Sequence, residues 1–215
     1  MNPLKWLLDL IYPPKCVFCG KILDTSQTDL CRACRAGLPE TAASVRQGKH
    51  FEICLSLCYY ENAVAESVRR YKFRGMSHYA DAYGRLLAMM LLRERVVFDL
   101  VSWVPISAKR ARERGYDQTR LLAEAVTKEL GAPCVQTLCK HRHNPAQSGM
   151  KSAKERHENV RDAYRAVDSE RFCGKRVLLL DDVITTGATL NECSRVLRNA
   201  GAASVICATL AATRN

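Results

Sequence analysis

Residues 177–189 constrain the fold more than any other part of the chain. They read Val-Leu-Leu-Leu-Asp-Asp-Val-Ile-Thr-Thr-Gly-Ala-Thr. Four consecutive apolar residues predict a central parallel strand that is covered on both faces. Asp181 and Asp182 follow at the carboxyl end of this strand, where open α/β sheets bind their ligands. The segment therefore predicts an α/β sheet with a polar site at one edge.

The rest of the chain alternates in the way that such a sheet requires. We expect strands at residues 53–60, 98–104, 134–138, 177–180 and 204–210, and helices at residues 63–73, 77–93, 117–130 and 188–200. This alternation predicts a doubly wound parallel sheet. The 215 residues suffice for one domain and a small module. We expect a short helix and a cysteine-bearing module at 1–40, a polar linker at 41–52 and the α/β domain at 53–215.

The loop after the acidic pair has the composition of a phosphate site. Its hydroxyl groups and glycine lead into a helix in the order Thr185, Thr186, Gly187, Ala188 and Thr189. The start of a helix offers backbone N–H groups and the positive end of the helix dipole to an anion. The lysine of a Walker loop is absent. A solvated turn, capped by the threonines, is the alternative interpretation.

Four of the eleven cysteines form two C-x-x-C pairs, Cys16 with Cys19 and Cys31 with Cys34. Two such pairs supply the four thiolates of a tetrahedral site, which predicts structural Zn²⁺ with no open position. A redox dithiol is the alternative, but it needs only one pair. The other seven cysteines are scattered without regular spacing, and this fits a reducing compartment.

Residues 4–12 are the one candidate for a targeting segment. A membrane span needs about 20 apolar residues, and Asp9 interrupts this much shorter stretch. We expect a short amphipathic helix that packs on its own domain, with a membrane-surface anchor as the alternative. The mean hydropathy of −0.19 also disfavours membrane insertion. The sequence therefore predicts a cytoplasmic protein.

The net charge of +11 is concentrated in one part of the chain. Residues 101–165 hold 13 Lys and Arg against 7 Asp and Glu, so +6 of the total lies there. Within this span, residues 109–114 form a basic run directly after a predicted strand. Such a run suits a phosphorylated ligand, and the alternatives are a solvated helix start or a nucleic-acid surface.

Residues 179–189 resemble the phosphoribosyl-pyrophosphate (PRPP) signature of the type I phosphoribosyltransferases. Together with the two C-x-x-C pairs, the whole chain resembles the ComF family of competence proteins, which is related to amidophosphoribosyltransferases. The resemblance also includes residues 71–75, 104–105 and 114–118, and the single positions Gln147, Arg156 and Asn159. It implies a type I phosphoribosyltransferase-like sheet with an N-terminal zinc-ribbon module.

The resemblance also implies a role for each part of the site. Asp181 and Asp182 would be the catalytic acids that bind the ribose hydroxyls, and residues 185–189 would bind the 5′-phosphate. Mg²⁺ would accompany PRPP. The loop at 106–115 would face pyrophosphate, and a mobile loop at about 141–158 would close over the site. The basic residues assigned to pyrophosphate are Lys109, Arg110, Arg114 and Arg156.

Two departures from the pattern of related enzymes narrow the range of activities that we expect. Thr185 stands where purine-salvage enzymes carry an acidic base, which disfavours purine salvage. No nucleophile for glutamine-driven amine transfer is evident, because the N-terminal cysteines are assigned to metal.

Three functions stay open. The resemblance favours a PRPP-binding protein of DNA uptake or utilisation, with single-stranded DNA and a DNA-uptake helicase as partners. An active phosphoribosyltransferase with an unidentified nitrogen acceptor is the alternative, and a catalytically idle regulator is the third. Aromatic residues make up only 7% of the chain, so the stacking surface that single-stranded DNA prefers is small.

Overall fold

The computed structural model describes residues 13–142 and 160–214. The described helices are α2 (Arg32–Ala36), α3 (Asn62–Phe73), α4 (Tyr79–Arg93), α5 (Ala108–Arg114), α6 (Gln118–Leu130) and α8 (Ala188–Asn199). The strands are β1 (Ser44–Arg46), β2 (Cys54–Tyr59), β3 (Leu100–Trp103), β4 (Leu138–Lys140), β5 (Tyr164–Ala166), β6 (Arg176–Ile184) and β7 (Ser204–Ala212). Within these ranges no helix is long and apolar enough to cross a membrane.

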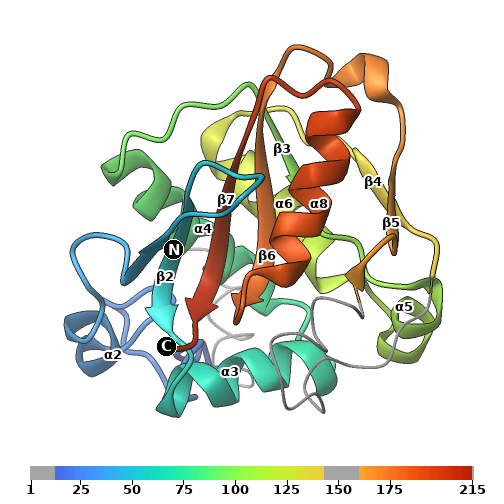
Figure 1. Cartoon of the computed structure of the whole chain (residues 1–215). Coiled ribbons are helices and arrows are strands. Elements are labelled where there is room, and N and C mark those ends of the chain that lie inside the picture. Colours follow the sequence, from blue (N-terminus) through green and yellow to red (C-terminus); the bar gives the residue numbers. More distant parts are fainter. Residues whose placement is uncertain (1–12, 143–159, 215) are drawn as a thin grey trace.

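The main sheet has the strand order β1-β2-β7-β6-β3. The last four strands run parallel, and β1 is antiparallel to β2 at one edge. Strand β6 lies between β7 and β3, with Leu178 opposite Ile206 and Leu179 opposite Ser102. Figure 1 shows α8 on one face of this sheet and α4 and α6 on the other. The predicted α/β architecture with a mostly parallel sheet is confirmed.

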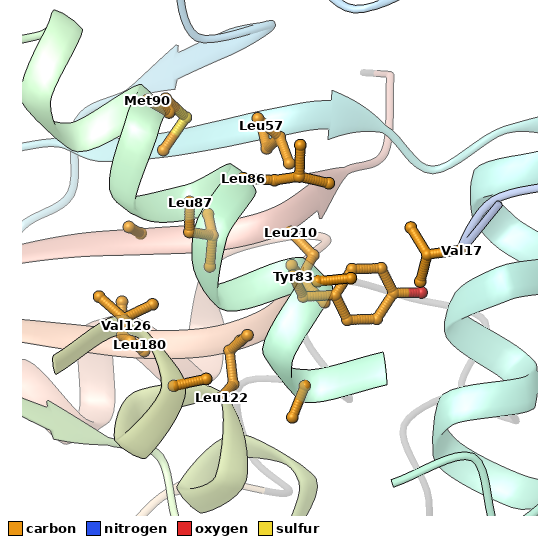
Figure 2. Packing of buried hydrophobic residues seen from close by; sticks show 14 of the residues in the cluster. Val17, Leu57, Tyr83, Leu86, Leu87, Met90, Leu122, Val126, Leu180 and Leu210 are labelled. Carbon is orange, nitrogen blue, oxygen red and sulfur yellow. The ribbon is translucent and has the colours of Figure 1, made fainter. Parts of the chain in front are cut away.

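Strand β6 buries both of its faces because its apolar residues alternate between two cores. Leu178 and Leu180 pack on the side of α4 and α6, whereas Val177 and Leu179 pack on the side of α8. All four are essentially inaccessible to solvent. Figure 2 shows the first core, where side chains from β2, β6 and β7 meet those of α4 and α6.

The cysteine-bearing module packs directly against the main domain. The hydroxyl of Ser67 donates a hydrogen bond to the carbonyl of Val17, and the Arg70 guanidinium donates to the carbonyl of Phe18 at 2.6 Å. Arg85 on α4 forms a two-pronged ion pair with Asp29, at 2.5 and 2.8 Å. Val17 and Phe18 lie between the first two cysteines, so the module and helices α3 and α4 share one core.

Three local features differ from the sequence expectation. The stretch expected as a linker, 41–52, contains β1. The strand expected at 134–138 forms instead at Leu138–Lys140, because Cys134 makes only a single bridge to Val101 at the sheet edge. Strand β6 continues through the acidic pair to Ile184, because β7 offers hydrogen-bond partners as far as Ala212.

Candidate functional site

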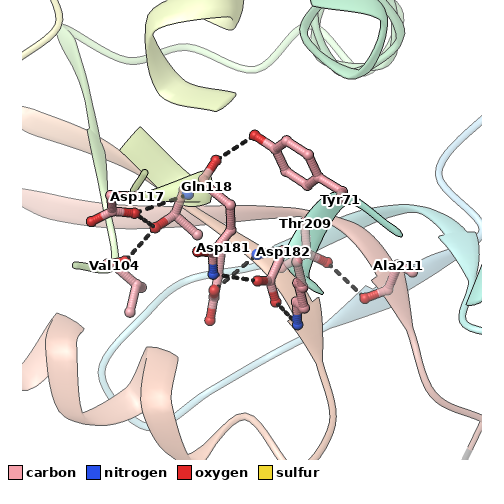
Figure 3. Close-up of polar contacts among 10 residues, drawn as sticks. Tyr71, Val104, Asp117, Gln118, Asp181, Asp182, Thr209 and Ala211 are labelled. Carbon is pink, nitrogen blue, oxygen red and sulfur yellow. Dashed lines mark hydrogen bonds and ion pairs between the residues drawn. The ribbon is translucent and has the colours of Figure 1, made fainter. Parts of the chain in front are cut away.

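The acidic pair lies where β6 extends past its neighbour β3. Pairing between these strands ends at Leu180, whose carbonyl accepts a hydrogen bond from the Val104 amide at 2.9 Å. The Asp182 amide donates to Oδ1 of Asp181 at 2.8 Å, which fixes the Asp181 side chain against the backbone of Asp182. Figure 3 shows both carboxylates in a network of polar contacts beside Gln118. The topology therefore holds two carboxylates at the carboxyl edge of the sheet.

Asp182 is buried and has a partner for each carboxylate oxygen. The Lys72 ammonium lies 2.6 Å from Oδ1, and the Gln118 side-chain amide donates to Oδ2 at 3.0 Å. Burial alone would raise the pKa of Asp182, but the charge and hydrogen bond of Lys72, helped by Gln118, hold it below its usual value. Asp182 is therefore ionised in the folded protein at neutral pH.

The pKa of Asp181 shifts in the opposite direction. Burial, and then the negative charge of Asp182, raise the pKa of Asp181 to about 8. The acidic pair therefore carries less than two full negative charges near neutral pH.

The loop that follows leads directly into the start of α8. Gly187 precedes α8 with φ of 77°, in the left-handed region where glycine is favoured. The Thr186 hydroxyl accepts a hydrogen bond from the Ala188 amide at 3.4 Å. The Arg46 guanidinium donates to the carbonyl of Thr185 at 2.5 Å and also to the carbonyl of Thr213. Arg46 thus anchors the loop to the end of β7, and the first amides of α8 follow Gly187.

One cavity of about 1030 Å³ joins these elements. The acidic pair lines it together with Thr185 and Thr189 of the loop. The lining also contains six basic residues: Arg69, Lys72, Arg74, Arg110, Arg114 and Lys140. A cavity with this balance of charge suits an anionic ligand that also carries hydroxyl groups.

The basic run folds as α5, a short helix between two defined ends. Ser107 caps its start by accepting from the Arg110 amide at 3.4 Å, and Gly115 ends it in the left-handed conformation with φ of 80°. Arg114, in the last turn, lies over the ring of Phe73 at 4.8 Å. Its Nη1 is buried without a hydrogen-bond partner among the described residues. Arg114 also lines the cavity, so its guanidinium places a positive charge at the wall of the site.

Lys140 enters the cavity from β4. Its ammonium donates to the hydroxyl of Tyr164 at 3.1 Å. Burial, and then the nearby positive charge of Arg110, lower the pKa of Lys140.

The structure separates the basic residues that were assigned to pyrophosphate. Arg110 and Arg114 line the cavity. Lys109 is not among the lining residues: its side chain is 61% exposed, and its ammonium lies 4.0 Å from the carboxylate of Glu113. Arg156, and most of the expected mobile loop, lie outside the described residues.

Sequence reasoning missed Lys72, Gln118, Lys140 and Arg46 as site residues. Lys72 and Gln118 lie within the segments 71–75 and 114–118 that carry the family resemblance, but no role was attached to them. Lys140 and Arg46 have no such signal, because only the folded chain brings β1 and β4 to the site.

The four paired cysteines converge as predicted. The sulfur atoms of Cys16, Cys19, Cys31 and Cys34 all lie within 4.8 Å of one another. Tetrahedral Zn–S bonds of about 2.3 Å require sulfur atoms about 3.8 Å apart, so the cluster fits a zinc ion. Four thiolates leave no open coordination position. The cluster is therefore a structural zinc site.

Comparison with known families finds one matching family for each of the two parts of the chain. Residues 119–215 match the phosphoribosyl transferase domain family, and residues 7–55 match the double zinc ribbon domain family. The parallel sheet, the acidic pair and these matches define a type I phosphoribosyltransferase-like protein with an N-terminal zinc ribbon.

Individual relatives show more closely which proteins this chain resembles. The chain is 28% identical to competence protein F of Haemophilus influenzae, over 87% of this chain and 92% of the relative. It is 27% identical to DNA utilization protein YhgH of Escherichia coli, over 91% and 90% of the two chains. Competence protein ComFC of Bacillus subtilis is 29% identical, over 89% of this chain and 74% of the relative. The chain is therefore similar, over most of its length, to competence proteins of the ComF type.

Proposed function

We propose that the cavity binds PRPP. The observation that supports this most strongly is the meeting of three elements in one cavity: the acidic pair, the loop before α8 and the cationic side chains. PRPP needs each of them, because it carries vicinal hydroxyl groups, a 5′-phosphate and a diphosphate.

Each part of the ligand has a matching part of the site. Asp181 and Asp182 accept hydrogen bonds from the ribose hydroxyls. The amides and hydroxyls of residues 185–189 bind the 5′-phosphate at the start of α8. Arg110 and Arg114 then face the diphosphate, where charge-assisted hydrogen bonds are strongest.

Mg²⁺ would enter this site with the diphosphate of PRPP. Carboxylate and phosphate oxygens are the ligands that this ion prefers, and Asp181 and Asp182 supply the carboxylates of the cavity. The ion would neutralise part of the charge of the diphosphate.

Calorimetric titration with PRPP and Mg²⁺ tests the proposal. The wild-type protein should bind, and the double variant Asp181→Ala/Asp182→Ala should lose most of the affinity. Lys128→Ala, a change at an exposed position of α6 outside the cavity lining, serves as the control. Equal binding by the wild type and the double variant would show that the acidic pair does not hold the ribose.

We further propose that PRPP binding serves the uptake or utilisation of DNA, in the cytoplasm. The proposal is supported by the printed names of the relatives, which refer to competence and to DNA utilization. Single-stranded DNA and a helicase are the partners that this role suggests. Titration of a labelled oligonucleotide at several salt concentrations tests direct contact, because binding through phosphates weakens steeply as salt rises. An affinity that does not change with salt would contradict it.

Transfer of the ribose phosphate to a nitrogen acceptor is the second candidate function. It is favoured by the size of the cavity, since about 1030 Å³ is at the upper end of the range for small-molecule sites and leaves room beside PRPP. Release of pyrophosphate from PRPP, measured over a panel of bases and amines, tests this function. A protein that binds PRPP tightly and releases pyrophosphate with none of them would be a binding protein or regulator.

A further inference from the structure

Lys72 makes a direct and largely buried contact with the acidic pair. Its side chain is 19% exposed, and its ammonium lies 2.6 Å from Oδ1 of Asp182, whose side chain is 8% exposed. An ammonium group has three donors. Asp182 takes one of them, and Lys72 also lines the cavity that we assign to the ligand.

The backbone around Lys72 is held in place from two sides. The neighbouring Tyr71 donates from its hydroxyl to the carbonyl of Gln118 at 2.6 Å, and Tyr116 donates to the carbonyl of Tyr71. Earlier in α3, Arg70 is tied to the zinc module through the carbonyl of Phe18. The ammonium is therefore presented by a fixed helix end.

The next residue along α3 places a second cation beside the first. Phe73 carries the Arg114 guanidinium over its ring at 4.8 Å, and the charge of Asp182 acts on Arg114 as well as on Lys72. Arg114 Nη1 has no hydrogen-bond partner among the described residues. Two cations thus converge beside Asp182, and only one of them is paired with it.

We infer that Lys72 is a ligand-binding residue whose ammonium bridges Asp182 and the diphosphate of PRPP. The inference rests on the proposed function and adds a residue to which the family resemblance attached no role. One N–H of Lys72 stays on Asp182, and the other two donate to diphosphate oxygens beside Arg114. The bridge couples the ribose-binding carboxylate to the negative charge at the other end of the ligand.

The two halves of the ligand separate this role from a structural one. Inorganic pyrophosphate tests the diphosphate half, and ribose 5-phosphate tests the ribose half. In Lys72→Gln the affinity for pyrophosphate and for PRPP should fall by about ten-fold, as expected for a lost charge-assisted contact. The affinity for ribose 5-phosphate should fall by less than the affinity for pyrophosphate, since ribose 5-phosphate lacks the diphosphate and meets Lys72 only through Asp182. Lys72→Arg should restore much of the pyrophosphate binding because it keeps the charge.

Calorimetry on the full-length, zinc-loaded protein provides these affinities, and thermal unfolding checks that each variant is folded. Lys128→Gln, on the exposed side of α6, is the matched control and should bind all three ligands like the wild type. Unchanged pyrophosphate binding in Lys72→Gln would overturn the inference, and so would an equal loss for ribose 5-phosphate. A wild-type protein that does not bind PRPP would instead refute the proposed function.

Discussion

The Tyr71 hydroxyl donates a hydrogen bond of 2.6 Å to the backbone carbonyl of Gln118. This bond joins the end of α3 to the start of α6, directly beside the acidic pair (Figure 3). Both residues are buried. The two segments that surround Asp182, which are distant in the sequence, are therefore fixed to one another.

Removal of this hydroxyl should destabilise the protein and loosen the site. Tyr71→Phe leaves the Gln118 carbonyl without its donor, and a buried hydrogen bond contributes about 1 kcal/mol. Urea unfolding should show a loss of this size, with weaker PRPP binding. Tyr59→Phe, which keeps the ring that lies under Arg214, should change stability by only a few tenths of a kcal/mol. Equal stability of Tyr71→Phe and the wild type would contradict the role of this bond.

The loop before α8 depends on the left-handed conformation of Gly187. A Cβ atom there would have ordinary contacts, the nearest at 3.7 Å, but φ of 77° strains any other residue. Gly187→Ala should cost about 1 kcal/mol and should weaken PRPP binding. Gly37→Ala is the matched control, because φ is −84° at that position. Loss of PRPP binding from both variants alike would show that the backbone of the loop is not the cause.

The raised pKa of Asp181 predicts how stability depends on pH. The folded protein keeps this proton up to a pKa of about 8, whereas the unfolded chain releases it near the ordinary value of 3.8. The folded state binds more protons across that window, so this group makes the free energy of unfolding fall as pH rises from about 4 to about 8.

Asp181→Asn should therefore flatten the decline and be more stable than the wild type at the upper end of the window. Denaturant unfolding at several pH values measures how the free energy of unfolding changes with pH. The exposed Asp81→Asn change is the control. An unchanged slope in Asp181→Asn would show that Asp181 is ionised throughout the window.

Loss of zinc should weaken the whole protein and not only the ribbon. Val17 and Phe18 belong to the same core as α3 and α4, so an unfolded module would expose part of that core. Cys31→Ser should lose bound zinc and lower the unfolding temperature of the entire chain. Cys173→Ser, an exposed position outside the cluster, should keep its zinc. Unfolding of the α/β domain at the wild-type temperature in Cys31→Ser would mean that the two parts are independent.

Local patterns predicted the parts of the site that are contiguous in the chain. The apolar run, Asp181, Asp182 and the loop to Gly187 form a strand, its end and a helix start, each of which has its own sequence signal. The zinc cluster was predictable for the same reason, because its spacing is itself the signal.

Long-range partners were not predictable in this way. Lys72 contacts Asp182 from α3, and Lys140 lines the same cavity from β4; neither lies in a charge pattern that points to a ligand. Lys109 and Arg110 are adjacent in the sequence, but only the rotation of α5 places one outside the cavity and the other in its lining. That difference of one residue depends on where Ser107 caps the helix.

A crystal structure of the protein with PRPP and Mg²⁺ tests the central claim most directly. The account predicts the 5′-phosphate on the amides of residues 185–189, the ribose hydroxyls at Asp181 and Asp182, and the diphosphate beside Arg110 and Arg114. A PRPP molecule bound away from the acidic pair, or with its 5′-phosphate away from the start of α8, would contradict it.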